Sequence, residues 1–182
     1  VSPLTVSLAQ NRMSEEALRA MRETILSHID EVREAVTLRA PYFGEEKLHV
    51  YDLMAPAPIA EKAACTIPYP EGIAIVKKAL GTVSPELSGF LDTMLENRWV
   101  DAKPSEKKIG GAFYSRFNEF RIPRVFASYT GTITTVLQQA HELGHAFHYW
   151  MMRDLPVVQT EFPMTLTETA STFNEAVLRH HL

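Results

Sequence analysis

The spacing of apolar residues predicts a long amphipathic helix near the start of the chain. Between residues 14 and 40 apolar side chains recur every three or four positions, as on one face of an α-helix. Ser14 precedes two glutamates and is a typical helix N-cap, while Ala40 meets Pro41, which a helix interior does not accommodate. We expect a buried stripe formed by Leu18, Met21, Ile25, Ile29, Val32 and Val36.

The next part of the chain interrupts this pattern and then returns to it. Five prolines between residues 41 and 70 favour a loop, with one edge strand at 48–53. Two scaffold helices follow. The first covers residues 73–80, and the second begins at Ser84 and Pro85, which form an N-cap and first-turn pair.

The second half of the chain changes from a strand-like pattern to a helical one. Glycine, aromatic and β-branched residues at 110–114 and 124–129 are typical of short strands. Apolar residues recur at helical spacing from 133 to 151, and Pro163 with the threonines that follow it favours a further helix. The pattern therefore predicts a mainly α-helical protein with a small β-sheet, an α+β fold.

Composition narrows the class of protein. The chain is 46% hydrophobic and 22% charged, which is typical of a folded soluble protein. A net charge of -4 gives no excess of Lys and Arg, so we expect no nucleic-acid partner. The chain has neither an apolar run that could span a membrane nor a signal-peptide pattern, and its lone cysteine, Cys65, suits a reducing compartment. We expect a cytoplasmic protein with no membrane partner.

The length of the chain suits one domain. We expect residues 1–182 to form a single catalytic domain. The chain begins with Val1 rather than Met and ends at Leu182 within a helical pattern, so we also expect it to be a piece of a longer protein.

The chemistry of the chain is concentrated in the helix predicted over 133–151. It contains the run from His141 to His145, of sequence HELGH. Four residues advance a helix by about 400°, so the two imidazoles lie one turn apart on one face and can reach the same metal ion. Glu142 points about 100° away from the first histidine and can reach a water beside that metal. Its position suits a general base.

Two histidines leave a catalytic zinc ion short of the three protein ligands it normally has. Glu168 is the favoured third ligand, because a carboxylate in the first turn of the helix expected after Pro163 can face the first helix rigidly. His148 is the main rival, although one straight helix can hardly place three donors around a tetrahedral ion. Glu175 can accept a hydrogen bond from a ligating histidine. The candidates considered are His148, Asp154, Glu161, Glu168, Glu175, His180 and His181.

These residues predict one zinc ion and hydrolytic chemistry. Two imidazoles and one carboxylate suit several divalent metals, of which zinc is preferred. A metal-activated water would attack a peptide bond, with Glu142 as the base and the peptide extended along residues 125–129. The alternatives are a catalytically silent, zinc-stabilised helical module for binding or assembly, an inactive fragment of a longer enzyme, and a chance motif in a helical scaffold. We assign no substrate-binding residues and no oligomeric state.

Two segments of the chain resemble the active-site segments of a known family. Residues 141–148, HELGHAFH, and 168–175, ETASTFNE, look like those of the oligoendopeptidase F and thimet oligopeptidase family of zinc metallopeptidases. The likeness extends to residues 48–53, 98–101 and 110–113, and it is closer to the oligoendopeptidase F branch.

The resemblance carries its own expectations. It implies a zincin-like catalytic fold, with Glu168 as third ligand and Glu142 as base. It also implies cleavage of short peptides rather than folded proteins. Members of this family continue well beyond such a segment, and a later segment brings Tyr and His residues near the site.

Overall fold

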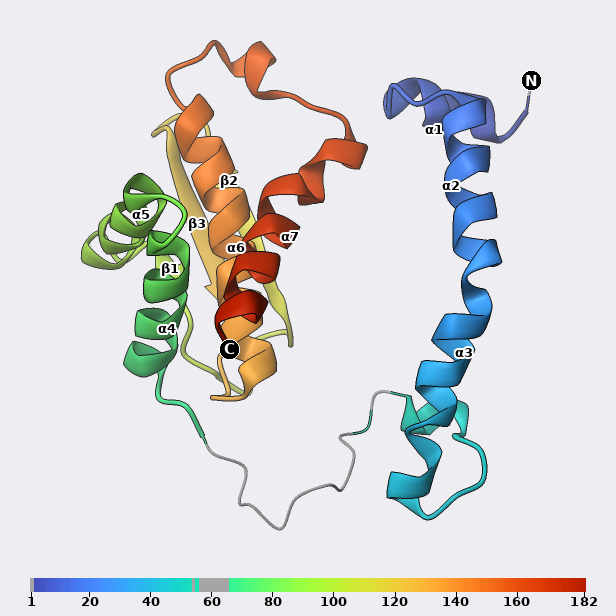
Figure 1. Cartoon of the computed structure of the whole chain (residues 1–182). Coiled ribbons are helices and arrows are strands. Elements are labelled where there is room, and N and C mark those ends of the chain that lie inside the picture. The colour runs from blue at the N-terminus through green and yellow to red at the C-terminus, as the bar shows by residue number, and fades with distance from the viewer. Residues whose placement is uncertain (1, 54, 56–65) are drawn as a thin grey trace. The chain divides into compact units, whose positions relative to one another are not determined.

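The computed structural model describes residues 2–53, 55 and 66–182 of the chain (Figure 1). The contacts between residues divide it into two compact units, Val1–Ala63 and Ala64–Leu182. That the two together act as one catalytic domain stays a prediction. Cys65 lies outside the described residues.

The first unit contains short helices where a single long one was predicted. Its elements are α1 (Leu4–Gln10), α2 (Glu15–Ser27), α3 (Ile29–Thr37) and the 3-10 turns η1 (Ala40–Phe43) and η2 (Val50–Asp52). Ser14 caps α2, as predicted, by accepting the backbone N–H of Ala17 at 3.0 Å. The helix then breaks at His28. A ring nitrogen of His28 bonds the Thr24 carbonyl, and the His28 backbone N–H bonds Ile25 instead, so helical bonding shifts register.

Two further predictions for this unit are wrong. No residue of α2 or α3 is buried, and Met21, Ile25 and Val32 of the expected stripe are 48%, 57% and 57% exposed. Periodicity predicts which face of a helix is apolar but not whether another element covers it. The edge strand expected at 48–53 is instead the turn η2, because the Asp52 carboxylate accepts the backbone N–H of His49 at 3.2 Å and closes the backbone locally.

The second unit confirms the predicted fold class, mainly helical with a small sheet. Its elements are α4 (Tyr69–Gly81), α5 (Pro85–Glu96), β1 (Val100–Asp101), β2 (Ala112–Phe117), β3 (Ile122–Ala127), α6 (Ile133–Met152), η3 (Val157–Thr160) and α7 (Met164–His181). All four helices predicted in this part of the chain are present. The predicted sheet is also present, in the order β1-β3-β2, with β3 antiparallel to β2 and parallel to β1.

Helix α6 lies at the centre of this unit. It packs on β2 and β3, on α4 and on α7, which runs beside it in Figure 1. One side of α6 contributes Val136, Ala140 and Leu143 to the apolar core, each of them fully buried. A fully buried leucine stabilises the fold by about 1.5–3 kcal/mol, so this contact fixes the orientation of α6. The histidines occupy the opposite side, towards α7.

Helices α6 and α7 approach each other at the level of their backbones. A Cβ atom on Gly144 would lie 2.6 Å from the Ala170 carbonyl oxygen and 2.8 Å from the Ser171 Cα, so only glycine fits there. Nearby, the buried side chain of Asn174 donates a hydrogen bond to the Ala140 carbonyl at 3.1 Å. Together these contacts set the distance and the register of α7 on α6.

Candidate metal centre

The two histidines of the HELGH run face the same point beside α6. Their Nε2 atoms are 3.2 Å apart. The Nδ1 atom of His141 bonds Glu175 Oε1 at 2.7 Å, and the ring of His145 bonds the Thr167 backbone. A carboxylate accepts hydrogen bonds, so the His141 ring donates from Nδ1, and this leaves a lone pair on its Nε2.

Electrostatics favour the same arrangement. Burial lowers the pKa of His145, so its ring is neutral at neutral pH. Burial alone would raise the pKa of Glu175, but hydrogen bonds from His141 and Arg179 outweigh this effect and lower it. Glu175 is therefore an ionised acceptor for His141, at the position where the sequence predicted one.

Glu168 completes the group from α7. Its Oε2 atom lies 3.2 Å from His141 Nε2 and 3.3 Å from His145 Nε2. It is the fifth residue of α7, just past the first turn in which the sequence predicted it, because the helix begins at Met164. Within the described part of the chain, His141, His145 and Glu168 are the one cluster of potential ligands close enough to hold a metal ion.

The spacing of these three atoms fits a metal ion. Donors about 2.0–2.1 Å from a tetrahedral zinc ion are separated by about 3.3–3.4 Å. The observed separations are 3.2, 3.2 and 3.3 Å. The lone pair on His141 Nε2 and the Glu168 carboxylate repel each other at this distance, and a cation between them would remove the repulsion. Geometry and donor chemistry therefore agree.

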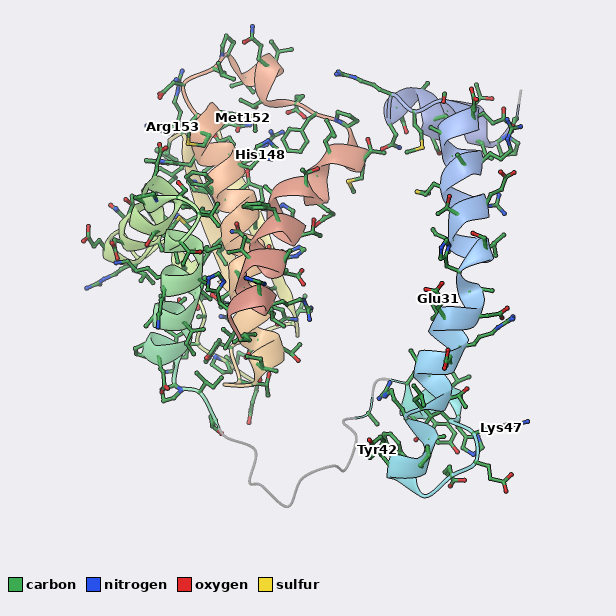
Figure 2. All side chains as sticks on the ribbon, viewed as in Figure 1. Glu31, Tyr42, Lys47, His148, Met152 and Arg153 are labelled. Carbon is green, nitrogen blue, oxygen red and sulfur yellow. The ribbon has the colours of Figure 1, made fainter. Side chains whose placement is uncertain are left out.

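The rival ligands lie elsewhere. His148 stacks on Phe162, with ring centroids 4.7 Å apart, and Figure 2 labels it one turn before Met152 near the end of α6. Burial lowers the pKa of His148. Asp154 lies 3.7 Å from a guanidinium nitrogen of Arg153, and the remaining candidates are absent from the cluster described above. These remaining candidates are Glu161, His180 and His181.

Glu142 is buried beside the cluster, with 7% of its surface exposed. Burial is the largest influence on its pKa and raises it, and the neighbouring Glu168 adds to the rise, while His141 and a hydrogen bond from the Tyr114 backbone oppose it; the resulting pKa is about 6. A carboxylate with a pKa of about 6 is ionised at neutral pH and binds a proton readily. It therefore has the properties of a general base.

A pocket of about 480 Å³ adjoins these groups. It lies between the start of β2, the first half of α6 and the end of α7. Its lining includes Ala112, Ile133, Leu137, Gln138 and Arg179, together with His141, Glu142 and Glu175. The pocket is thus bordered by the groups suited to proton transfer and metal binding.

The strand expected to receive a peptide is not available for that role. Residues 125–127 belong to β3, which pairs with β1 on one side and β2 on the other, so its main-chain groups are already bonded. In the described sheet, β2 is an edge strand, and its side facing away from β3 is unpaired. Tyr114 of β2 stacks on the His145 ring, with centroids 5.9 Å apart. No pattern in the sequence indicated a role for Tyr114.

Comparison with solved structures and with family models assigns this chain to a protein family. The fold matches a crystal structure of PZ peptidase A with inhibitor 2, with a TM-score of 0.75 and 25% identity over 94% of this chain and 31% of that one. It also matches a protein of Chlamydophila abortus described as a peptidase, with a TM-score of 0.77 and 24% identity over 98% of this chain and 29% of that one. The model of peptidase family M3 matches residues 2–182. The chain belongs to this family.

The sequence relatives support the predicted branch. The chain is 28% identical to Oligopeptidase PepF of Bacillus subtilis (strain 168) and 27% identical to the Oligoendopeptidase F homolog of Lactococcus lactis subsp. lactis (strain IL1403). Each match covers 97% of this chain, but only 26% and 29% of the respective relative. Among the described residues, no helix is long and apolar enough to cross a membrane.

Proposed function

We propose that this chain carries the metal-binding and catalytic residues of a zinc endopeptidase that hydrolyses short oligopeptides. The observation that carries the proposal is the convergence of His141, His145 and Glu168 within 3.3 Å of one another, beside the buried Glu142. Membership of peptidase family M3 and the names of the relatives support it. The chain spans 26–29% of the length of these relatives, so activity of the whole protein is part of the proposal.

The residues have separate roles in this proposal. His141, His145 and Glu168 hold the zinc ion, and Glu175 keeps the His141 ring oriented through its 2.7 Å hydrogen bond. A zinc ion held there would supply Lewis-acid chemistry, by which a bound water becomes more acidic and the scissile carbonyl more polarised. Glu142 accepts the proton of the attacking water and delivers it to the leaving amine, so the proton taken up in the first step is returned in the second.

The substrate would bind in an extended form. The outer edge of β2 passes beside Glu142, which accepts the Tyr114 backbone N–H, so a peptide lying along this edge would bring its main chain to the base. Bonds between main chains read no particular sequence. The adjoining pocket would receive one substrate side chain against Ile133 and Leu137. We therefore expect broad specificity modulated by this pocket.

Metal content and hydrolysis test the proposal together. The purified full chain is loaded with zinc, and its metal content is measured beside cleavage of a quenched fluorescent peptide. We expect one zinc ion per chain, retained in Glu142→Gln with cleavage lost, and absent from His141→Ala. His148→Ala is the matched control, because this histidine stacks on Phe162 away from the cluster, and it should retain its zinc.

The outcomes separate the alternatives. A chain that binds no zinc contradicts the proposed metal site. Cleavage retained by Glu142→Gln contradicts the role of the base. One bound zinc ion without cleavage by the wild-type chain would contradict catalysis by this chain alone. A fourth protein donor on that zinc ion would then favour the zinc-stabilised module, and an open fourth position would favour an inactive fragment of the enzyme.

A further inference from the structure

The hydroxyl group of Ser171 lies between α7 and the candidate ligands. Its Oγ atom is 2.7 Å from Oε2 of Glu168, the same oxygen that faces both histidines. Ser171 is fully buried, and its Cα lies against Gly144 of α6, where the two helices are closest. Bulk water therefore does not compete with this hydroxyl for Glu168.

Ser171 Oγ has a second possible acceptor, the Glu168 backbone carbonyl at 3.0 Å. The hydroxyl has a single proton, which it can donate to only one acceptor at a time. Thr172 already donates to the same carbonyl at 2.5 Å. A hydrogen bond to a carboxylate is stronger than one to a neutral carbonyl, and here it is also the shorter of the two. The Ser171 proton therefore serves the Glu168 carboxylate.

The Glu168 side chain has little else to hold it. It is 56% exposed and its rotatable bonds give it many conformations, whereas a metal ligand must stay in one. A carboxylate oxygen has two lone pairs, so Oε2 can accept the Ser171 proton and still face the histidines. A residue at 171 must also be small, because its backbone lies against Gly144.

We propose that Ser171 is a positioning residue, whose hydroxyl fixes the Glu168 carboxylate towards His141 and His145 and so strengthens metal binding. This rests on the proposed zinc site. Serine bonding within its own helix is common without any such role, so the test must separate an effect on Glu168 from an effect on α7.

Zinc affinity provides this test. The full chain is titrated with zinc in competition with a chromophoric chelator, and urea unfolding of each metal-free variant reports its folding. We expect Ser171→Ala to weaken zinc binding by about 10–100-fold, as is typical when a partner of a metal ligand is lost. The matched control is Thr172→Ala, which removes the neighbouring hydroxyl from the Glu168 carbonyl and leaves the carboxylate bond intact. It should stay near the wild-type affinity.

A second comparison identifies the route of the effect. In a Glu168→Ala background, Ser171→Ala should weaken zinc binding little further, because the carboxylate through which the hydroxyl acts is gone. Ser171→Cys replaces the hydroxyl with a weak donor while filling the site, and we expect it to lose affinity as Ser171→Ala does. It also provides a second variant should the alanine form fold poorly.

Three results would overturn the proposal. Wild-type affinity in Ser171→Ala would overturn it while leaving the zinc site standing. An equal loss in the wild-type and Glu168→Ala backgrounds would show that Ser171 acts only through the packing of α7. A wild-type chain that binds no zinc would remove both the proposed function and this role.

Discussion

Replacing Glu142 by Gln should stabilise the metal-free protein while abolishing its proposed activity. The Glu142 carboxylate is buried, and burial raises its pKa from the usual 4.5 to about 6. The folded chain therefore binds a proton at this site more tightly than the unfolded chain does. The charged form costs stability at neutral pH, and Gln carries no charge to bury.

The magnitude follows from the pKa. The difference between 4.5 and about 6 corresponds to about 2 kcal/mol of the free energy of unfolding. The protonated group has no such cost, so the contribution of Glu142 to stability is greatest below pH 4.5 and is lost as the pH rises through about 6. Glu142→Gln should thus be more stable than the wild type by up to about 2 kcal/mol above pH 7, and the difference should shrink towards zero in acid.

Urea unfolding followed by tryptophan fluorescence measures this difference. The only two tryptophans of the chain, Trp99 and Trp150, both lie in the second unit, with ring centroids 5.8 Å apart, so their signal reports the unit that holds Glu142. Zinc is removed with a chelator, and the wild type and Glu142→Gln are compared at pH 7.5 and at pH 4.5. The control is Glu119→Gln, whose exposed carboxylate is solvated in the folded and unfolded chain alike.

A gain in stability that is the same at both pH values would refute the reasoning, because it could not come from an ionised carboxylate. A loss of stability at pH 7.5 would refute it more directly. It would mean that the hydrogen bond from the Tyr114 backbone outweighs the cost of burying the charge.

Three further outcomes are expected. The kcat/KM for peptide cleavage should fall as the pH falls below about 6, because Glu142 must be ionised to accept a proton, and a flat profile down to pH 5 would contradict this. Gly144→Ala should weaken zinc binding in a chelator titration and cost about 1–3 kcal/mol in urea unfolding, since its Cβ would lie 2.6 Å from the Ala170 carbonyl; unchanged affinity would exclude a role for this contact. Gln139→Leu should raise the urea midpoint by an amount equivalent to about 1–3 kcal/mol, because the amide oxygen and nitrogen of buried Gln139 have no hydrogen-bond partner among the described residues. A lower midpoint would contradict this and would indicate that a bound water pairs with the amide.

The sequence predicted those features that repeat locally along the chain. Helix α6 and the two helices before the sheet follow from apolar spacing and from caps such as Ser84, which accepts the Leu87 N–H at 3.2 Å. The two histidines four residues apart lie together because helical geometry alone places them so. Strand β1 has only two residues and depends on pairing with β3, so no local pattern could reveal it.

The first unit shows the opposite case. Its helices have the predicted apolar spacing, and yet Ile25 and Val32 are exposed. Amphipathic spacing predicts which face of a helix can pack against another element, but it does not show that such an element is present. The helix breaks at His28 because a ring nitrogen of His28 bonds the Thr24 carbonyl in place of a backbone N–H. The spacing of apolar residues does not reveal such a side-chain bond.

The candidate metal centre combines both kinds of information. The HELGH run predicts that two imidazoles share one face of α6, but the reach of Glu168 depends on how closely α7 approaches. That approach is possible because Gly144 has no side chain, and Asn174 sets its register through the Ala140 carbonyl. Gly144 lies inside the motif and yet offers no ligand. Gly144 contributes to the centre because it lets α7 come close to α6. The sequence could therefore favour Glu168 as the third donor, but the position of Glu168 relative to the histidines depends on how the two helices pack.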